Sequence, residues 1–251
     1  MKKWIQNMLL LFQLLTRVPI NKALPCEEND FRRASNFFPI VGLFIGIIQY
    51  ILCYFLDTAV TAYVMALIVA LAEIILTGGF HVDGFADTCD GFFAYKGKDR
   101  IISIMKDSRL GTFGCIAIVA DMLLRVLLLG DIIADSAYSS LYILIIPIIA
   151  RTSIAFLSYI GKPAKEEGMG NLFIETVTIR EVIVGIVVGM LITFGVLGII
   201  ETLILFITAA LVTILFNVYC KSKIGGITGD SLGANNEIVT FALMIVVYIM
   251  M

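Results

Sequence analysis

Charged residues are scarce in this chain. Only 15% of its 251 residues are Asp, Glu, Lys or Arg, whereas 60% are hydrophobic, and the mean hydropathy is +1.00. These values exclude an ordinary soluble domain and favour a protein embedded in a lipid bilayer. The formal net charge is −2, so there is no basic excess that would attract nucleic acid.

The cysteine pattern of a disulfide framework or a zinc site is also missing. The five cysteines are odd in number, and no two of them are spaced as C-x-x-C. We therefore expect the cysteines to act as small apolar side chains.

Six apolar stretches come close to the roughly 20 residues that a membrane helix needs. They cover 37–56, 60–78, 113–130, 139–160, 182–199 and 203–219. A seventh stretch, 238–251, has only 14 residues and would cross only in a thinned bilayer or with an earlier start. We expect an all-α fold: a single membrane-embedded domain over 1–251, built as a polytopic bundle of about six to seven transmembrane helices.

The apolar stretch 4–15 follows Lys2 and Lys3 and superficially resembles a secretory signal peptide. It contains three amide side chains, and no A-x-A-like cleavage site follows it. We therefore expect an interfacial or re-entrant N-terminal helix that is not cleaved.

Basic residues alternate from one loop to the next. The short segments between the first and second, third and fourth, and fifth and sixth spans contain none. Sixteen of the 18 basic residues lie in four other segments: 1–36, 79–112, 161–181 and 220–237. The positive-inside rule assigns these segments to the cytoplasm. We expect a multi-pass protein of the cytoplasmic membrane, with its N-terminus and active site on the cytoplasmic side.

Three aspartates, Asp83, Asp87 and Asp90, lie in the sequence G-G-F-H-V-D-G-F-A-D-T-C-D-G-F at 78–92. Their spacings of four and three residues place them on one face of a helix. Their mutual repulsion favours a hard cation between them, and Mg²⁺ suits carboxylates and substrate phosphates. His81 is a secondary candidate for a general base, a proton shuttle or a partner of a metal ligand. The alternative is a solvated acidic helix face.

A second polar segment, K-D-S-R-L-G-T-F-G at 106–114, lies on the same predicted side. Lys106 and Arg109 are placed to meet phosphate oxygens, and Asp107 can serve as a metal ligand or a proton acceptor. Contact with lipid headgroups is the alternative for the two basic residues. Glycine pairs at 78–79 and 225–226 can bring backbone N–H groups close to an anion, or can simply form turns.

Four charged residues lie inside the predicted spans. Each costs several kcal/mol if it faces lipid unpaired, so we expect all four to point inward. Asp121 and Arg125 are four residues apart, which predicts an ion pair within one helix. Glu73 and Arg151 either pair across helices or line a cavity.

Five motifs spread over most of the chain carry a resemblance. They are F-P-I-V-G at 38–42, the aspartate segment at 78–92, I-M-K-D-S-R-L-G-T-F-G at 104–114, P-A-K-E-E-G-M-G at 163–170 and G-G-I-T-G-D-S-L-G-A at 225–234. In this order the motifs resemble the cobalamin synthase family, the adenosylcobinamide-GDP ribazoletransferases. Lys165 and Met169 depart from that family's A-R-x-x-G-L-G-like segment, and lysine keeps the charge of arginine but loses its bidentate geometry.

The resemblance implies a magnesium-dependent membrane enzyme of vitamin B12 synthesis. Such an enzyme joins adenosylcobinamide-GDP to α-ribazole, or to its 5′-phosphate, and releases GMP. The product is adenosylcobalamin or its phosphate. The implied partners are these small molecules and membrane lipid, with no nucleic acid, and a homo-oligomer is compatible with this interpretation.

The resemblance also implies roles for individual residues. Asp83, Asp87 and Asp90 would hold Mg²⁺, and one of them or Asp107 would accept the proton of the attacking hydroxyl. Lys106 and Arg109 would hold the GDP phosphates. Asp230 would bind the metal or a ribose. The other candidates for phosphate contacts are Ser108, Lys165, Gly225, Gly226, Thr228 and Ser231.

Two other function classes share part of the pattern. CDP-alcohol phosphatidyltransferases carry D-x-x-D-G-x-x-A-R, which Asp87, Asp90, Gly91 and Ala94 match, but Tyr95 stands in place of the arginine. A secondary transporter would use the charged residues within the spans as an ion path. The polar motifs instead gather at one predicted interface, which favours the transferase. A purified transferase releases GMP, whereas a transporter forms no product.

Overall fold

The computed structural model describes residues 2–94, 96–136, 138–165 and 168–251; Tyr95 and the side chain of Met169 lie outside the described part. The described residues form helices and no β-strand. The helices are α1 (Lys3–Leu15), α2 (Glu28–Ala34), α3 (Phe38–Leu56), α4 (Ala62–Thr77), α5 (Phe80–Phe93), α6 (Lys98–Met105), α7 (Thr112–Asp135), α8 (Leu141–Ile160), α9 (Ile179–Leu197), α10 (Ile199–Ile224) and α11 (Gly229–Met250), with short 3₁₀ turns η1 (Ser35–Phe37) and η2 (Met169–Leu172).

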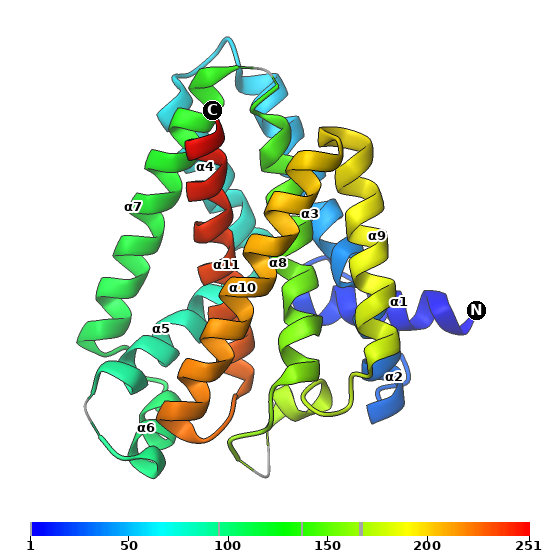
Figure 1. Ribbon diagram of the computed structural model, residues 1–251, viewed down its shortest axis with the longest axis vertical. Coiled ribbons are helices and arrows are strands. Elements are labelled where there is room, and N and C mark those ends of the chain that lie inside the picture. Colours follow the sequence, from blue (N-terminus) through cyan, green and yellow to red (C-terminus); the bar gives the residue numbers. More distant parts are fainter. Residues whose placement is uncertain (1, 95, 137, 166–167) are drawn as a thin grey trace.

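The long helices run side by side as a bundle (Figure 1). Five are long and apolar enough to cross a membrane: 28–56, which ends in α3, and then α8, α9, α10 and α11. The count rises to six if α4 and α5 together form one span. α7 has 24 residues and packs against α4. It is not among the helices that are apolar enough to count as membrane spans. The predicted class, an all-α polytopic membrane bundle, is confirmed.

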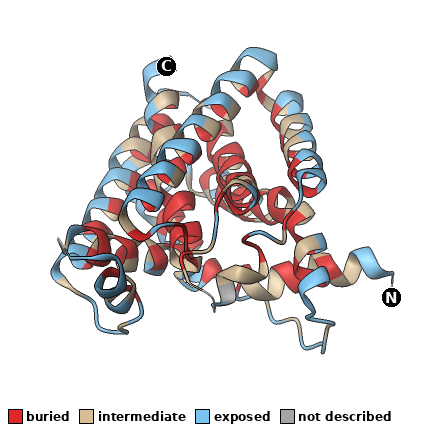
Figure 2. Ribbon diagram, turned by 60° about the horizontal axis from the view of Figure 1, so that its bottom comes forward, coloured by how far each residue is buried: buried red, intermediate tan, exposed pale blue. Residues whose placement is uncertain are grey.

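Each predicted span coincides with a helix. The seventh stretch begins earlier than its apolar run, because α11 starts at Gly229 and reaches Met250. α8 lies in the middle of the bundle, where it contacts α3, α9, α10 and α11 and is buried along most of its length. Figure 2 shows the buried residues on the inward-facing sides of the helices.

A sharp turn separates α4 from the aspartate helix α5. Gly78 and Gly79 both have left-handed backbone conformations, with φ of +65° and +73°. A residue with a Cβ atom would pay roughly 1–2 kcal/mol in this region. The axes of α4 and α5 consequently differ by 91°. α5 therefore runs across the end of the bundle instead of continuing α4 through it.

The predicted N-terminal helix is α1, which lies across the direction of the long helices in Figure 1. It packs against α2 and α3. Leu11 and Leu15 are buried against the bundle, whereas Trp4 is 54% exposed. Its interfacial or re-entrant position in a membrane stays a prediction.

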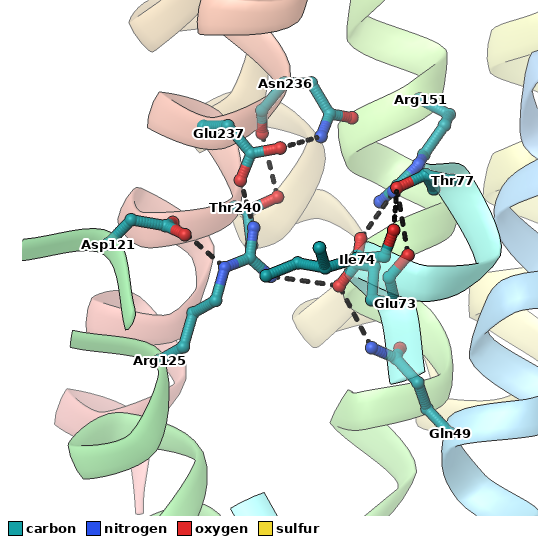
Figure 3. A network of polar contacts seen from close by, with 10 residues as sticks. All are labelled: Gln49, Glu73, Ile74, Thr77, Asp121, Arg125, Arg151, Asn236, Glu237 and Thr240. Carbon is teal, nitrogen blue, oxygen red and sulfur yellow. Dashed lines mark hydrogen bonds and ion pairs between the residues drawn. The ribbon is translucent and has the colours of Figure 1, made fainter. Parts of the chain in front are cut away.

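An ion network is buried between four helices (Figure 3). Arg125 on α7 donates from Nη1 to Oε2 of Glu73 on α4 at 2.9 Å and from Nε to Oδ1 of Asp121 at 3.0 Å. Arg125 also pairs with Glu237 on α11, and Arg151 on α8 pairs with Glu73. The predicted ion pair of Asp121 with Arg125 is confirmed. Of the two alternatives for Glu73 and Arg151, the structure shows pairing across helices.

Two amide side chains extend this network. Gln49 on α3 donates to Oε2 of Glu73 at 3.0 Å, and Asn236 donates to Oε1 of Glu237 at 3.0 Å. The buried charges therefore meet opposite charges or hydrogen-bond donors, as low-dielectric surroundings require. The network ties α3, α4, α7, α8 and α11 together near the cavity described next.

Candidate active site

The aspartate helix α5 crosses the beginning of α11 at two glycines. A Cβ atom at Gly84 would lie 2.9 Å from the carbonyl oxygen of Asp230, and one at Gly233 would lie 3.2 Å from Cα of His81. A larger side chain at either glycine would push the helices apart. The close crossing brings Asp83 of α5 and Asp230 of α11 to one cavity.

The first turn of α11 is held by a reciprocal cap. Oγ1 of Thr228 accepts the N–H of Ser231, and Oγ of Ser231 accepts the N–H of Thr228, both at 3.2 Å. Thr228 also donates to Oδ2 of Asp230 at 3.2 Å. Both capping residues are buried and neither lines the cavity. Thr228 and Ser231 therefore cap the helix and hold Asp230, and their phosphate contacts stay predictions.

The loop before α11 pairs with the segment after α8. The N–H of Ile227 donates to the carbonyl of Lys162 at 2.7 Å, and the N–H of Ala164 donates to the carbonyl of Ile227 at 2.9 Å. This pairing places Lys165 beside the cavity that Asp230 also lines. Lys165 is thereby the one predicted phosphate-binding cation that the described structure brings to the cavity.

Gly225 and Gly226 make this pairing possible. Gly225 ends α10 with φ of +77°, and a Cβ atom at Gly226 would collide with the carbonyl oxygen of Lys162. Neither glycine lines the cavity. The two glycines therefore shape the turn, and their contact with phosphate stays a prediction.

The cavity has a volume of about 210 Å³. Its walls come from α1, α3, α5, α8, Lys165, the segment 168–173 and α11. Its polar side chains are His81, Asp83, Lys165 and Asp230. The remaining wall is formed by glycines and by apolar side chains such as Leu15, Phe38 and Phe173. The cavity thus suits a ligand that has both charged and apolar parts.

Carboxylates crowd together along α5. The charges of Asp83, Asp230 and Asp90 act on the carboxylate of Asp87. Among the described residues, no group of three His, Cys, Asp or Glu side chains is placed to hold a metal ion. Mg²⁺ needs only one or two carboxylates when waters and phosphates supply its other oxygens. Asp83 and Asp87 fit that donor set, and their metal role stays a prediction.

The carboxylate of Asp90 is used elsewhere. Its Oδ2 accepts the N–H of Gly111 at 2.7 Å, and its Oδ1 accepts the N–H of Gly114 at 2.8 Å. These N–H groups belong to the start of α7, where helices lack internal acceptors. The side chain of Asp90 therefore joins α5 to α7, and its metal role stays a prediction.

Replacing Asp90 with alanine should lower the free energy of unfolding by about 1–2 kcal/mol, because the start of α7 loses its acceptor. Thermal unfolding can be followed with a thiol-reactive dye, since Cys53 and Cys220 are buried. The exposed Asp57 offers a control, and Asp57→Ala should change stability by less than about 0.5 kcal/mol. Equal stability of D90A and D57A would contradict the capping role.

The segment 106–109 lies outside the cavity lining. Arg109 pairs with Asp107 at 2.6 Å, and Lys106 and Ser108 are exposed. The hydrogen bond from Arg109 lowers the pKa of Asp107 to about 2. The role of Asp107 as proton acceptor stays a prediction. Phosphate contacts of Lys106, Ser108 and Arg109 stay predictions.

His81 lies in the first turn of α5 and is buried. Its Nδ1 has no hydrogen-bond partner among the described residues. His81 also lines the cavity. Its roles as general base, proton shuttle or partner of a metal ligand stay predictions.

Comparison with known proteins identifies the family. The family model described as cobalamin-5-phosphate synthase matches residues 7–248. The chain belongs to this family. It is 43% identical over 245 residues to the adenosylcobinamide-GDP ribazoletransferase of Clostridium tetani, covering 97% of this chain and 96% of the relative. No solved structure matches the chain.

Two further relatives carry the same name. The Clostridium kluyveri protein is 43% identical over 247 residues, which cover 98% of this chain and 97% of the relative. The Clostridium botulinum protein is 41% identical over 247 residues, which cover 98% and 99%. The resemblance to cobalamin synthases is thus confirmed, and it is favoured over a CDP-alcohol phosphatidyltransferase or a transporter.

The motifs of this cobalamin synthase family member meet in space. Four of the five supply residues to the cavity wall, and Asp90 ties the fifth, at 104–114, to α5. The contributing motifs are those at 38–42, 78–92, 163–170 and 225–234. Motifs that lie far apart in the chain therefore build one site.

Sequence reasoning missed Glu237, the partner of Arg125. Glu237 directly precedes the predicted span 238–251, so the apolar run alone places its charge outside the membrane. The polar run N-N-E at 235–237 ahead of an apolar stretch is the signal that could have revealed it.

Proposed function

We propose that this cobalamin synthase family member joins adenosylcobinamide-GDP to α-ribazole or its 5′-phosphate and releases GMP. A ribose hydroxyl attacks the phosphorus that carries the cobinamide, a new P–O bond forms, and the P–O bond to GMP breaks. The observation that carries the proposal is the cavity at which four family motifs meet, with carboxylates and one cation on its polar side.

The residues at the cavity suit this reaction. Asp83 lines the cavity with a carboxylate that can accept the proton of the attacking hydroxyl. Lys165 can neutralise the charge of the transferred phosphate, since transition states of phosphoryl transfer carry charge on several oxygens. The apolar wall can hold an uncharged part of a substrate and exclude water from the reacting atoms.

Magnesium is part of the proposal. Asp83 and Asp87 would hold the ion, with Asp230 on the adjoining helix as a further oxygen donor. When bound, Mg²⁺ supplies charge neutralisation and a bridge to the phosphate oxygens.

We further propose that the site faces the cytoplasm from a cytoplasmic membrane. The argument is the loop pattern of Lys and Arg, in which the segments that follow α4, α8 and α10 belong to the basic side. A site that faces the cytoplasm would also be accessible to phosphorylated substrates made in the cytoplasm, which cannot cross the membrane.

The proposal predicts metal-dependent turnover. Purified protein in detergent, incubated with adenosylcobinamide-GDP, α-ribazole and Mg²⁺, should release GMP in a one-to-one ratio with adenosylcobalamin. A chelator should stop the release, and excess Mg²⁺ should restore it. Absence of GMP from folded protein with both substrates present would contradict the reaction, whereas release that persists in chelator would contradict only the metal.

A further inference from the structure

A second hollow, which we call the basic groove, lies away from the active-site cavity. It has a volume of about 680 Å³ and is bounded by α1, the segment from α2 to the start of α3, and the start of α9. These helices lie together at the right of Figure 1. Four basic residues line it: Lys3, Arg32, Arg33 and Arg180. None of them lines the active-site cavity.

The positive charge of the basic groove is only partly neutralised. The lining contains one acidic residue, Glu181, and its Oε2 is occupied by the N–H and the hydroxyl of Thr178 at the start of α9. Glu181 lies 4.0 Å from Nε of Arg32, and that Nε has no hydrogen-bond partner among the described residues. Arg33 and Arg180 have no ion-pair partner in the described part of the chain. Nζ of Lys3 lies 3.8 Å from Oδ1 of Asp30. The groove therefore presents the guanidinium groups of Arg33 and Arg180 to an anion.

The rest of the groove is apolar and extends along two membrane spans. Ile40 belongs to α3, and Val184 and Val188 belong to α9. Both of these helices are long and apolar enough to cross a membrane. Trp4, the only tryptophan of the chain, also lines the groove. Tryptophan is typical of the boundary between lipid and water.

We propose that the basic groove binds an anionic phospholipid. Arg32, Arg33 and Arg180 would contact the phosphate, and an acyl chain would lie along Ile40 and Val184. Clusters of basic residues at the edge of a membrane span attract anionic lipid headgroups. A free phosphate ion shares the headgroup chemistry but makes no use of the apolar part of the groove, so the two ligands can be distinguished.

Trp4 provides the readout. The full chain is reconstituted in vesicles of phosphatidylcholine and phosphatidylglycerol at a fixed ratio. Bromine, which quenches tryptophan on contact, is placed on the acyl chains of the phosphatidylglycerol or of an equal amount of phosphatidylcholine. Brominated phosphatidylglycerol should quench Trp4 more strongly. Arg33→Gln and Arg180→Gln should each lower this lipid preference by about fivefold, the effect expected for one basic side chain.

Two controls make the test decisive. The first control is Lys221→Gln. Lys221 is an exposed basic residue on α10 outside the groove, so this substitution should leave the lipid preference unchanged. Inorganic phosphate should also leave it unchanged when compared with chloride at the same ionic strength. Equal quenching by the two brominated lipids would overturn the proposal. It would also be overturned by a K221Q effect as large as that of R33Q, or by loss of the preference in phosphate alone.

Discussion

Replacing Arg125 with methionine should lower the free energy of unfolding by about 3–5 kcal/mol, the usual cost of removing one partner from a buried ion pair. The guanidinium of Arg125 is shared by Glu73, Asp121 and Glu237, which come from three helices. Its loss would leave three buried carboxylates with Arg151 as the remaining cation of the network. The expected decrease in Tm is on the order of 10 °C for a chain of this size.

The same thiol-dye experiment measures this effect. Exposed Arg100 on α6 provides the control, since Arg100→Met should change stability by less than about 0.5 kcal/mol. Adding Glu237→Gln to Arg125→Met should recover part of the loss, because it removes one unpaired charge. Equal unfolding temperatures for R125M and R100M would show that the network does not hold the bundle together.

Replacing Asp83 with asparagine should reduce the rate of GMP release by about a hundredfold to a thousandfold, the range for losing one electrostatic contact in a transition state. Asp83 lines the cavity, and asparagine keeps its shape while removing the negative charge. The amide can neither accept the proton of the attacking hydroxyl nor bind Mg²⁺ as strongly. Single-turnover assays with saturating substrates would measure the rate.

The matched control is Asp99, an exposed residue on α6 that does not line the cavity. Asp99→Asn should retain full activity, and D83N should keep the thermal stability of the parent chain. Unchanged turnover in D83N would remove this carboxylate from the proposed reaction. A large loss of stability in D83N would instead indicate a structural role.

Much of the fold could be predicted from the apolar runs. The stretch 37–56 became α3 and 139–160 became α8, because length and hydropathy alone define such segments. The start of α11 could not be predicted in this way. Its polar run at 235–237 is buried, and Glu237 is stabilised by Arg125 from a distant helix. Hydropathy along one segment contains no information about that partner.

The active site was predictable only in part. Helical periodicity correctly drew attention to the face of α5 that carries Asp83, which lines the cavity. The same periodicity grouped Asp90 with it, although its oxygens accept N–H groups of Gly111 and Gly114. Those donors lie 21 and 24 residues further along the chain. Spacing within one helix cannot reveal an acceptor role that depends on the arrival of another helix.

The length of α4 bears on the depth of the α5 carboxylates in the bilayer. Its 16 residues rise about 24 Å, which is less than the roughly 30 Å thickness of the hydrocarbon core. α5 departs sideways immediately after Gly79. On the proposed orientation, with the start of α4 at the outer face, the carboxylates of α5 would lie below the cytoplasmic lipid surface. A thinner bilayer would then bring them closer to water, and a thicker one would bury them more deeply.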